Sequence, residues 1–169
     1  IGPAGRRLVV FANVMCTIGD AAGRTGMGTV MGSKNLWAIA VRGKQPIKIA
    51  NPERLMNVAE KQYRQITQTK GYKATALYGT LMRLSISRTQ GQEPALNFQY
   101  NMLESGGEEF DPDVFVRKYE YGKMSCFNCP VHTKHLHRVP SGEHQGLTGS
   151  GPEYGGAGFF GSSCGTGDW

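Results

Sequence analysis

The pattern of apolar positions divides the chain into a first part that is typical of strands and a second part that is typical of helices. Residues 7–16 are mostly apolar and rich in β-branched side chains, which favours a buried strand, with a helix as the alternative. Residues 36–43 form another apolar run, closed by Gly43, and this run predicts a strand. Residues 44–50 show neither pattern and are expected to form a linker.

Helical spacing begins at residue 51. Asn51 is a favourable N-cap, Pro52 suits the first helical position, and Gly71 is a typical helix end. The apolar side chains between them share one helical face: Leu55, Met56, Ala59, Tyr63 and Ile66. The pattern therefore predicts a long amphipathic helix.

Shorter elements follow this helix. A second helical run is expected at about residues 73–84, and Asp111-Pro112 begins a short third one. Residues 85–110 are loop-rich, and the tail from Pro140 is rich in glycine and serine. Together these elements predict an α+β fold, and 169 residues are enough to bury a sizeable core.

Charge and composition narrow the class of protein. The chain has 19 basic and 13 acidic residues and a net charge of +6, but the basic residues are scattered, with no run longer than Arg6-Arg7. This favours a solvated surface, or one face of an assembly, over binding of nucleic acid. We expect a cytoplasmic protein with reduced thiols and no membrane span, because no secretory signal or long apolar run is present. The start at Ile1, without methionine, suggests part of a longer polypeptide.

The clearest candidate for chemistry is the pair Cys126 and Cys129, followed by Pro130. Cysteines at this spacing can direct two thiolates at one metal ion or iron–sulfur cluster, and soft thiolates bind both zinc and clusters. Zinc would need two further ligands, for which His132, His135 and His137 are available, although the loop would be short for a zinc finger. Buried free thiols are the structural alternative. On the residues alone, zinc and a cluster are equally supported.

A glycine-rich segment precedes the second apolar run. Its glycines at positions 23, 26, 28 and 32 allow close backbone approach, and Arg24 and Lys34 lie among or beside them. Such loops suit phosphate groups, but the pattern is neither a P-loop nor a dinucleotide fingerprint. A tight turn that packs against a short helix explains the glycines equally well.

The chain as a whole resembles the aldehyde ferredoxin oxidoreductase family of tungsten enzymes. The motifs that carry the resemblance occur in the family's order: Ile1-Gly2-Pro3-Ala4-Gly5, Ala22-Gly23-Arg24-Thr25-Gly26-Met27-Gly28, Val30-Met31-Gly32-Ser33-Lys34-Asn35-Leu36, Ala38-Ile39-Ala40-Val41-Arg42-Gly43, Asn97-Phe98-Gln99, Cys126-x-x-Cys129-Pro130 and Gly151-Pro152-Glu153-Tyr154. Within the family, the catalytic subunit of tungsten-dependent benzoyl-CoA reductases is also similar, and these motifs do not separate it from an aldehyde oxidoreductase.

The resemblance implies tungsten held by two molybdopterin-type pterins, a nearby 4Fe–4S cluster and a bridging magnesium ion. It implies that residues 1–48 end a β-rich domain that forms a base for the pterins, and that residues 49–169 begin a helical domain. The expected partners are ferredoxin or an electron-transfer subunit, and the rest of the same polypeptide, in an oligomer. The rival reading from another class is a small basic zinc module that binds nucleic acid.

The resemblance also assigns roles to residues. The pterin phosphates and magnesium would be bound by Arg24 and by backbone groups of the surrounding loop: Ala21, Ala22, Gly23, Gly26 and Gly28. Cys126 and Cys129 would ligate the cluster, and Glu153 would transfer protons near the tungsten.

Two positions depart from the family pattern. Thr133 stands where the family usually has a third cluster cysteine, so His132 or His135 is a candidate substitute. Asp20 stands where the family often has a basic residue, and Cys164 matches no cluster ligand, which suggests a packing role for it.

Overall fold

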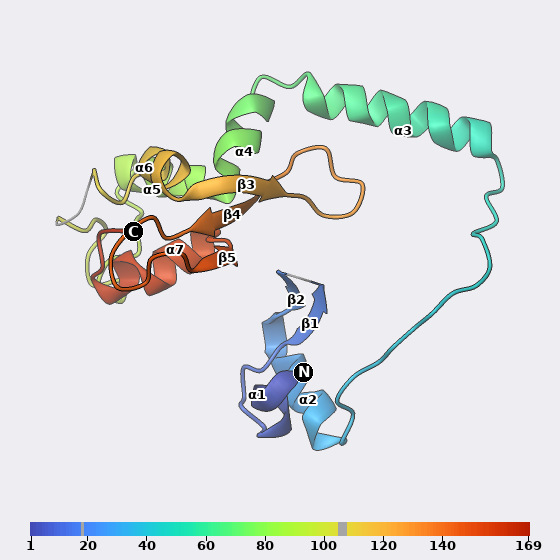
Figure 1. Cartoon of the computed structure of the whole chain (residues 1–169), viewed down its shortest axis with the longest axis horizontal. Coiled ribbons are helices and arrows are strands. Elements are labelled where there is room, and N and C mark those ends of the chain that lie inside the picture. Colours follow the sequence, from blue (N-terminus) through green and yellow to red (C-terminus); the bar gives the residue numbers. More distant parts are fainter. Residues whose placement is uncertain (18, 105–107) are drawn as a thin grey trace. The chain divides into compact units, whose positions relative to one another are not determined.

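The computed structural model describes residues 1–17, 19–104 and 108–169, and the chain divides into two compact units, residues 1–50 and 51–169 (Figure 1). Helices occur in both units, and each unit contains one small antiparallel sheet. The α+β class is therefore confirmed. No helix in the described ranges is long and apolar enough to cross a membrane.

The first unit is built on two short helices and a hairpin: α1 (Gly2–Arg6), β1 (Val14–Thr17), β2 (Asp20–Ala22), the 3-10 turn η1 (Arg24–Gly26) and α2 (Met27–Ser33). The helices α1 and α2 approach closely at glycines. A Cβ on Gly32 would lie 1.9 Å from the backbone oxygen of Gly5, so only glycine fits there.

Two strand predictions in this unit are wrong. Within residues 7–16 the chain is extended only from Val14, and residues 36–43 form no strand. A strand needs a neighbouring strand for its backbone groups, and none of the described residues forms a sheet with residues 36–43. Their apolar side chains are exposed, with 72% of Ile39 and 90% of Val41 accessible.

The second unit begins with the predicted long helix, α3 (Pro52–Thr67). The Asn51 side chain accepts a hydrogen bond of 2.9 Å from the Arg54 amide, as expected of an N-cap. The helix ends four residues before Gly71, and none of its residues is buried.

The second helical run is broken into three pieces: α4 (Tyr72–Tyr78), the turn η2 (Gly79–Leu81) and α5 (Met82–Thr89). The break follows from Gly79, whose φ is +53° and whose absent side chain lets the Thr133 carbonyl approach. The run also extends beyond residue 84, into the segment that we expected to be loop.

The third helix is α6 (Pro112–Lys118), which starts where it was predicted. The Asp111 side chain accepts a bond of 2.8 Å from the Asp113 amide and caps it. A further helix, α7 (Tyr154–Phe160), and the turn η3 (Ser162–Cys164) lie in the glycine-rich tail and were not predicted. Three glycines within α7 weaken the local helix signal, so tertiary packing decides its conformation.

A three-stranded antiparallel sheet of order β3–β4–β5 was also not predicted: β3 (Glu120–Met124), β4 (Lys134–Arg138) and β5 (Thr148–Ser150). Lys123 pairs with His135, and Leu136 pairs with Ser150. The connection between β3 and β4 contains both cysteines of the C-x-x-C motif.

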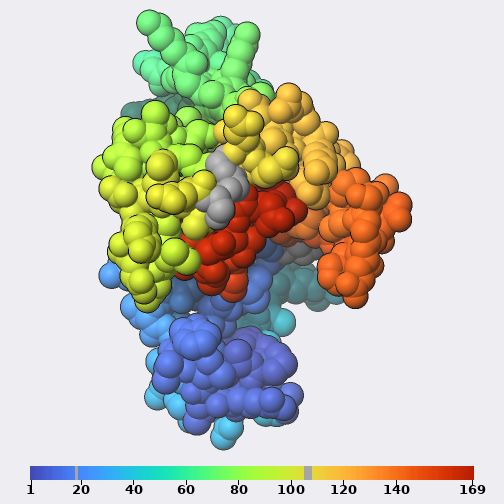
Figure 2. Space-filling view, turned by 90° about the vertical axis from the view of Figure 1, so that its left-hand side faces the viewer, coloured from blue at the N-terminus to red at the C-terminus, as the bar shows by residue number. Residues whose placement is uncertain are grey.

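The core of this unit lies between α5, α6, α7 and η2. Its buried members are Leu81, Leu84, Phe110, Phe115 and Ala157. On the face seen in Figure 2, the red C-terminal segment lies between the yellow-green residues around α5 and the orange loop that follows β4. The tail therefore closes the core, although it is rich in glycine.

Candidate functional site

The two motif cysteines lie in a tight turn between β3 and β4. The Cys129 amide donates a hydrogen bond of 3.0 Å to the Cys126 carbonyl, and Asn128 between them has a φ of +56°. Both thiols are free; Cys126 is exposed and Cys129 is half-buried. An accessible pair of thiols on one turn is the arrangement that a metal or cluster requires.

A pocket of about 550 Å³ borders this turn and the C-terminal half of α3. Cys129 and His132 line it from the turn, and Tyr63 and Ile66 line it from the helix. The Tyr72 hydroxyl donates a hydrogen bond of 3.0 Å to the Pro130 carbonyl, which fixes the turn to the start of α4. The turn is thus fixed to α4 at Pro130, while Cys129 remains accessible from the pocket.

The histidines after the motif do not complete a zinc site. His135 is fully buried, its Nε2–H donates to the Tyr78 carbonyl at 3.0 Å, and its Nδ1 contacts Glu120. His137 Nδ1–H donates to the Gly151 carbonyl at 2.8 Å. Among the residues that the structure describes, no three of the types His, Cys, Asp and Glu lie where they could hold one metal ion.

Thr133, at the position of the family's third cysteine, is half-buried, and its backbone is in close contact with Gly79. A Cβ on Gly79 would lie 2.3 Å from the Thr133 carbonyl, so the chain after the motif rests directly on η2. His135 is excluded as a substitute ligand because both of its ring nitrogens are engaged. His132 is exposed and borders the same pocket as Cys129.

Glu153 stands at the N-cap position of α7, at the start of the tail. It is half-buried, and its Oε2 accepts a hydrogen bond from the Thr80 hydroxyl. The same hydroxyl accepts a bond of 2.9 Å from the Tyr154 amide. The Glu153 carboxylate is therefore held in one place by η2, rather than moving freely as an ordinary surface glutamate does.

The turn η2 thus connects two of the predicted groups. Gly79 contacts the strand that follows the cysteine turn, and its neighbour Thr80 holds Glu153. Neither residue was singled out from the sequence. No local signal marks them, because their role arises from chain segments more than fifty residues apart.

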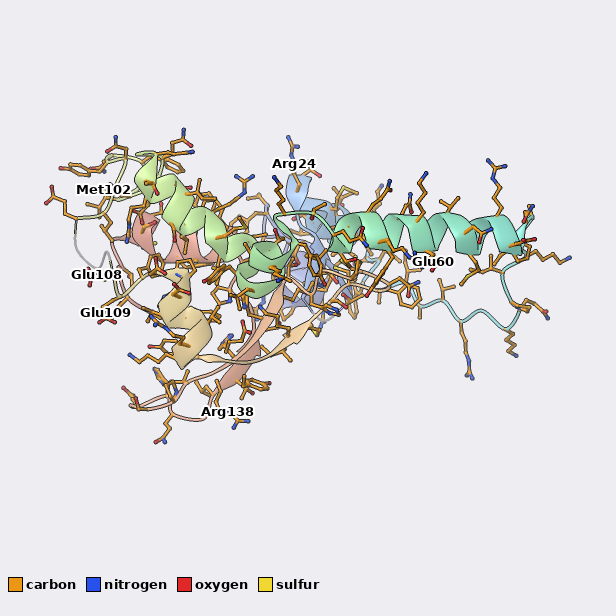
Figure 3. The ribbon with its side chains drawn as sticks, turned by 90° about the horizontal axis from the view of Figure 1, so that it is seen from above. Arg24, Glu60, Met102, Glu108, Glu109 and Arg138 are labelled. Carbon is orange, nitrogen blue, oxygen red and sulfur yellow. The ribbon has the colours of Figure 1, made fainter. Side chains whose placement is uncertain are left out.

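The phosphate-loop candidates lie in the first unit. Arg24 is exposed, and its side chain points away from the ribbon of that unit (Figure 3). Ala21 and Ala22 belong to β2, where they pair with Met15 and Val14 and keep their side chains exposed.

The glycines of this loop serve two different purposes. Gly26 has a φ of +66°, and a Cβ there would lie 2.2 Å from the Val10 carbonyl. The Gly28 amide donates to the Ala12 carbonyl at 2.9 Å. These two glycines are explained by packing within the unit. Gly23 has open space around it and an ordinary φ of −88°, so packing does not explain it.

A partly buried network of side chains links the hairpin that carries the cysteines to α4. The Lys123 ammonium donates to the Leu77 carbonyl at 2.6 Å and to Glu120 at 3.1 Å, beside His135. On the adjacent helix, the Tyr78 hydroxyl donates to Asp113 at 2.6 Å. That hydrogen bond, with burial and the charge of Asp113, raises the pKa of Tyr78 above its ordinary value.

Comparison with known proteins decides the family. The model for aldehyde ferredoxin oxidoreductase, domains 2 and 3, matches residues 57–169, and the model for the N-terminal domain of the same enzymes matches residues 1–43. The chain belongs to the aldehyde ferredoxin oxidoreductase family. Its relatives include tungsten-containing aldehyde ferredoxin oxidoreductases from Thermococcus kodakarensis, at 34% identity, and Pyrococcus abyssi, at 35%.

Each of these alignments covers 99% of this chain but only 27% of the relative. A more distant relative, the WOR-like subunit of an aliphatic sulfonate oxidoreductase from Pyrococcus furiosus, is 26% identical over 98% of the chain. This member of the aldehyde ferredoxin oxidoreductase family thus spans about a quarter of the length of the curated relatives that it matches.

Proposed function

We propose that the chain is the part of a tungsten–bispterin, iron–sulfur oxidoreductase that supplies a phosphate-binding loop, two cluster thiolates and one acid–base carboxylate. The observation that carries the proposal is the 34% identity over 99% of the chain to tungsten-containing aldehyde ferredoxin oxidoreductases. The accessibility of Arg24 and of the cysteine turn supports it.

In this proposal residues 1–48 belong to the pterin-base domain. The exposed Arg24 guanidinium would bind a pterin phosphate by paired hydrogen bonds, and backbone groups of Ala21, Ala22 and Gly23 would bind the phosphates or a magnesium ion. Gly26 and Gly28 would support the loop through the packing described above. Asp20 lies beside this loop and would repel a phosphate, so Arg24 would carry most of the attraction.

Residues 49–169 would begin the helical domain, where Cys126 and Cys129 supply two thiolates to a 4Fe–4S cluster. Two thiolates fit part of such a site, and the further ligands would come from the rest of the same polypeptide or from His132. When bound, the tungsten–pterin and the cluster supply electron transfer between the substrate and ferredoxin or a partner subunit.

Glu153 would exchange the proton that accompanies electron transfer. The Thr80 hydroxyl holds its Oε2 and so fixes the orientation of the carboxylate. A carboxyl that moves a proton must lie within hydrogen-bond reach of its target, and this fixed orientation favours such a role.

The substrate would be an aldehyde or an acyl-type compound, and the enzyme would be a cytoplasmic oligomer. An aldehyde oxidase that reduces ferredoxin and a catalytic subunit that reduces benzoyl-CoA both fit the motifs.

The test is a metal and activity analysis of the full-length protein, purified without oxygen. We expect tungsten, iron and acid-labile sulfide in fixed ratios, together with either aldehyde-dependent reduction of ferredoxin or reduction of benzoyl-CoA. Stoichiometric zinc with no tungsten or iron would reject the proposal and favour a zinc module.

A further inference from the structure

A second pocket of the 51–169 unit lies away from the cysteine turn, between α6, the end of β4 and the loop that follows it. Its volume is about 550 Å³, within the usual range for small-molecule sites. We call it the α6–β4 pocket. Pro152, which directly precedes Glu153, forms part of its wall.

Aromatic rings form the apolar part of this pocket. Phe115, of which only 3% is exposed, lies 4.9 Å from the Trp169 ring and 6.0 Å from the Tyr119 ring, measured between centroids. Trp169 and Tyr119 are half-buried, so part of each ring remains accessible. Flat, accessible rings of this kind bind a flat apolar group by stacking and by desolvation.

Hydrogen bonds hold these rings in place before any ligand arrives. The Trp169 Nε1–H donates to the Asp111 carbonyl at 3.1 Å, and the Tyr119 hydroxyl donates to the Trp169 carbonyl at 3.0 Å. A site that is already ordered loses less conformational entropy on binding.

The polar part of the pocket is basic. Lys118, His137 and His144 line it, and no acidic residue is among those that the structure places around it. Lys118 and His144 are exposed and can turn toward a ligand. Because His137 Nδ1–H already donates to Gly151, its Nε2 is the ring nitrogen left for other contacts. The Lys118 ammonium, with no acidic side chain beside it among the lining residues, attracts an anion.

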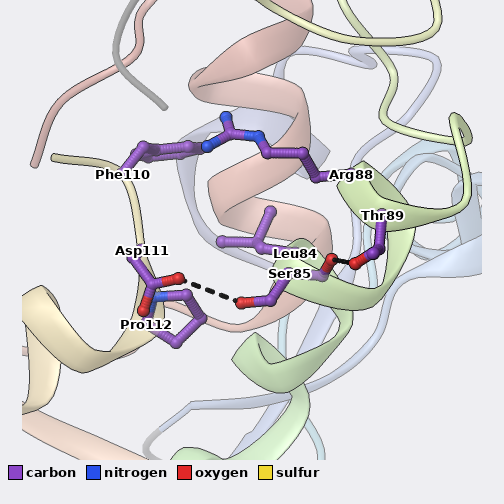
Figure 4. Close-up of a pocket in the computed structure, with 7 residues that line it drawn as sticks. All are labelled: Leu84, Ser85, Arg88, Thr89, Phe110, Asp111 and Pro112. Carbon is purple, nitrogen blue, oxygen red and sulfur yellow. Dashed lines mark hydrogen bonds between the residues drawn. The ribbon is translucent and has the colours of Figure 1, made fainter. Parts of the chain in front are cut away.

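A neighbouring pocket differs from the α6–β4 pocket in the state of its polar groups. It is smaller, about 320 Å³, and lies between α5 and the start of α6 (Figure 4). Its polar groups are already paired within the protein: Ser85 with Asp111, and Arg88 with the buried Glu93 at 3.0 and 3.2 Å. That pocket has no polar group of the kind that would select a charged ligand.

We propose that the α6–β4 pocket binds a small monocarboxylate with a flat apolar body, such as an aromatic acid. The rings of Phe115, Tyr119 and Trp169 would receive the apolar body, the Lys118 ammonium would attract the carboxylate, and a ring N–H of His144 would donate a hydrogen bond to it. The proposal rests on this pocket alone and not on the tungsten reaction. A carboxylic acid is nevertheless what the oxidation of an aldehyde yields, so the ligand shares its chemical class with a product of the proposed enzyme.

The test is a fluorine NMR titration of the full-length protein with para-fluorobenzoate, compared with neutral para-fluorobenzamide of the same shape. We expect saturable binding of the acid and roughly fivefold weaker binding of the amide, because an exposed ion pair contributes up to this scale. A salt concentration of about 0.15 M suppresses unspecific attraction. The readout requires no turnover, so an inactive preparation still tests the proposal.

Variants locate the site. The double variant Lys118→Met/His144→Gln should weaken binding of the acid by roughly fivefold and leave the amide unchanged. Arg117→Met is the matched control, because Arg117 is an exposed base on the same helix that does not line the pocket. All three residues are exposed, so the fold should persist.

Three outcomes would overturn the proposal. Equal binding of acid and amide would show that the pocket does not recognise charge. If Arg117→Met weakens binding of the acid as much as the double variant does, the protein's net charge alone attracts the acid. Absence of saturable binding by the acid would show that the pocket is not a site for this class of ligand.

Discussion

The two units of the chain differ in how much apolar surface each buries by itself. In residues 51–169, helices α5, α6 and α7 enclose Leu81 and Phe115, which are almost fully buried. In residues 1–50 the buried positions are mostly glycines at helix contacts, and large side chains such as Val10 and Phe11 are about 80% exposed. One unit has a side-chain core, and the other is held by close backbone packing.

This difference reflects how helical and extended segments satisfy their backbone hydrogen bonds. Helices satisfy their own backbone groups, so a few helices and a small hairpin can close a core locally. The apolar run of residues 36–43 would need neighbouring strands, and the described residues do not supply them. The first unit should therefore depend on contacts with other parts of the protein more strongly than the second.

The largest effect on stability should come from the core of the second unit. Leu81→Ala removes a side chain with no exposure and should lower the free energy of opening of α5–α7 by about 2–5 kcal/mol. The measurement is amide hydrogen exchange in the full-length protein. Lys73→Ala, at an exposed position of α4, is the control and should change stability by less than about 0.5 kcal/mol. An effect of Lys73→Ala as large as that of Leu81→Ala would contradict the assignment of Leu81 to the core.

The second effect concerns the carboxylate of Glu153, which lies in the unit of residues 51–169. Glu153→Gln keeps the shape of the side chain but removes its proton exchange, so turnover should fall by about 10²-fold while tungsten and iron are retained. Glu109→Gln, at an exposed position, is the control and should leave turnover unchanged. If Glu153→Gln turns over within about threefold of the wild type, far less than a general acid or base contributes, the carboxylate is structural and His132 becomes the next candidate.

The third effect separates the glycines of the first unit. Gly26→Ala combines a left-handed φ with a contact of 2.2 Å to Val10, so it should destabilise the packing of α2 by about 1–3 kcal/mol. Gly23→Ala meets no atom within 4 Å at an ordinary φ and should be nearly neutral for stability. Hydrogen exchange of the amides in α1 and α2 measures both. Equal effects of the two variants would contradict the division into packing and loop glycines.

The elements with local signals could be predicted from the sequence. Asn51-Pro52 and Asp111-Pro112 mark helix starts that the structure confirms, because a cap acts within one turn. The sheet β3–β5 could not be predicted, since its pairing joins residues ten to seventeen positions apart and only chain contacts select the register. The helix α7 was missed because its glycines weaken the local helix signal.

The residues of the candidate site likewise fall into those that a local motif marks and those whose role depends on the folded chain. The C-x-x-C spacing predicts Cys126 and Cys129 as ligands; this stays a prediction, and their turn is accessible as a ligand pair requires. The role of His135 could not be read from its spacing, because burial against Glu120 and Tyr78 determines it. The hydrogen bond from Thr80 to Glu153 likewise could not be predicted, because the two residues lie 73 positions apart in the sequence.

The smallest effect concerns the bond between α4 and α6. Tyr78→Phe removes the hydrogen bond to Asp113 and should cost about 0.5 kcal/mol, the low end for such a bond, because the site is partly open to water. The raised pKa of Tyr78 sets the pH dependence. The difference between wild type and variant should be constant below about pH 10, the value for unfolded tyrosine, and should shrink above it as the unfolded state loses its proton first. A difference that grows above that pH would contradict this assignment.

We propose that the two units bind different cofactors, and the metal contents of two variants can separate these two sites. In the full-length protein, Arg24→Ala should lose tungsten and pterin but keep iron, whereas Cys126→Ser should lose iron and sulfide but keep most of the tungsten. Cys164→Ser, at another exposed free thiol, is the control and should keep both. Full iron in Cys126→Ser, or unchanged tungsten in Arg24→Ala, would contradict this proposal.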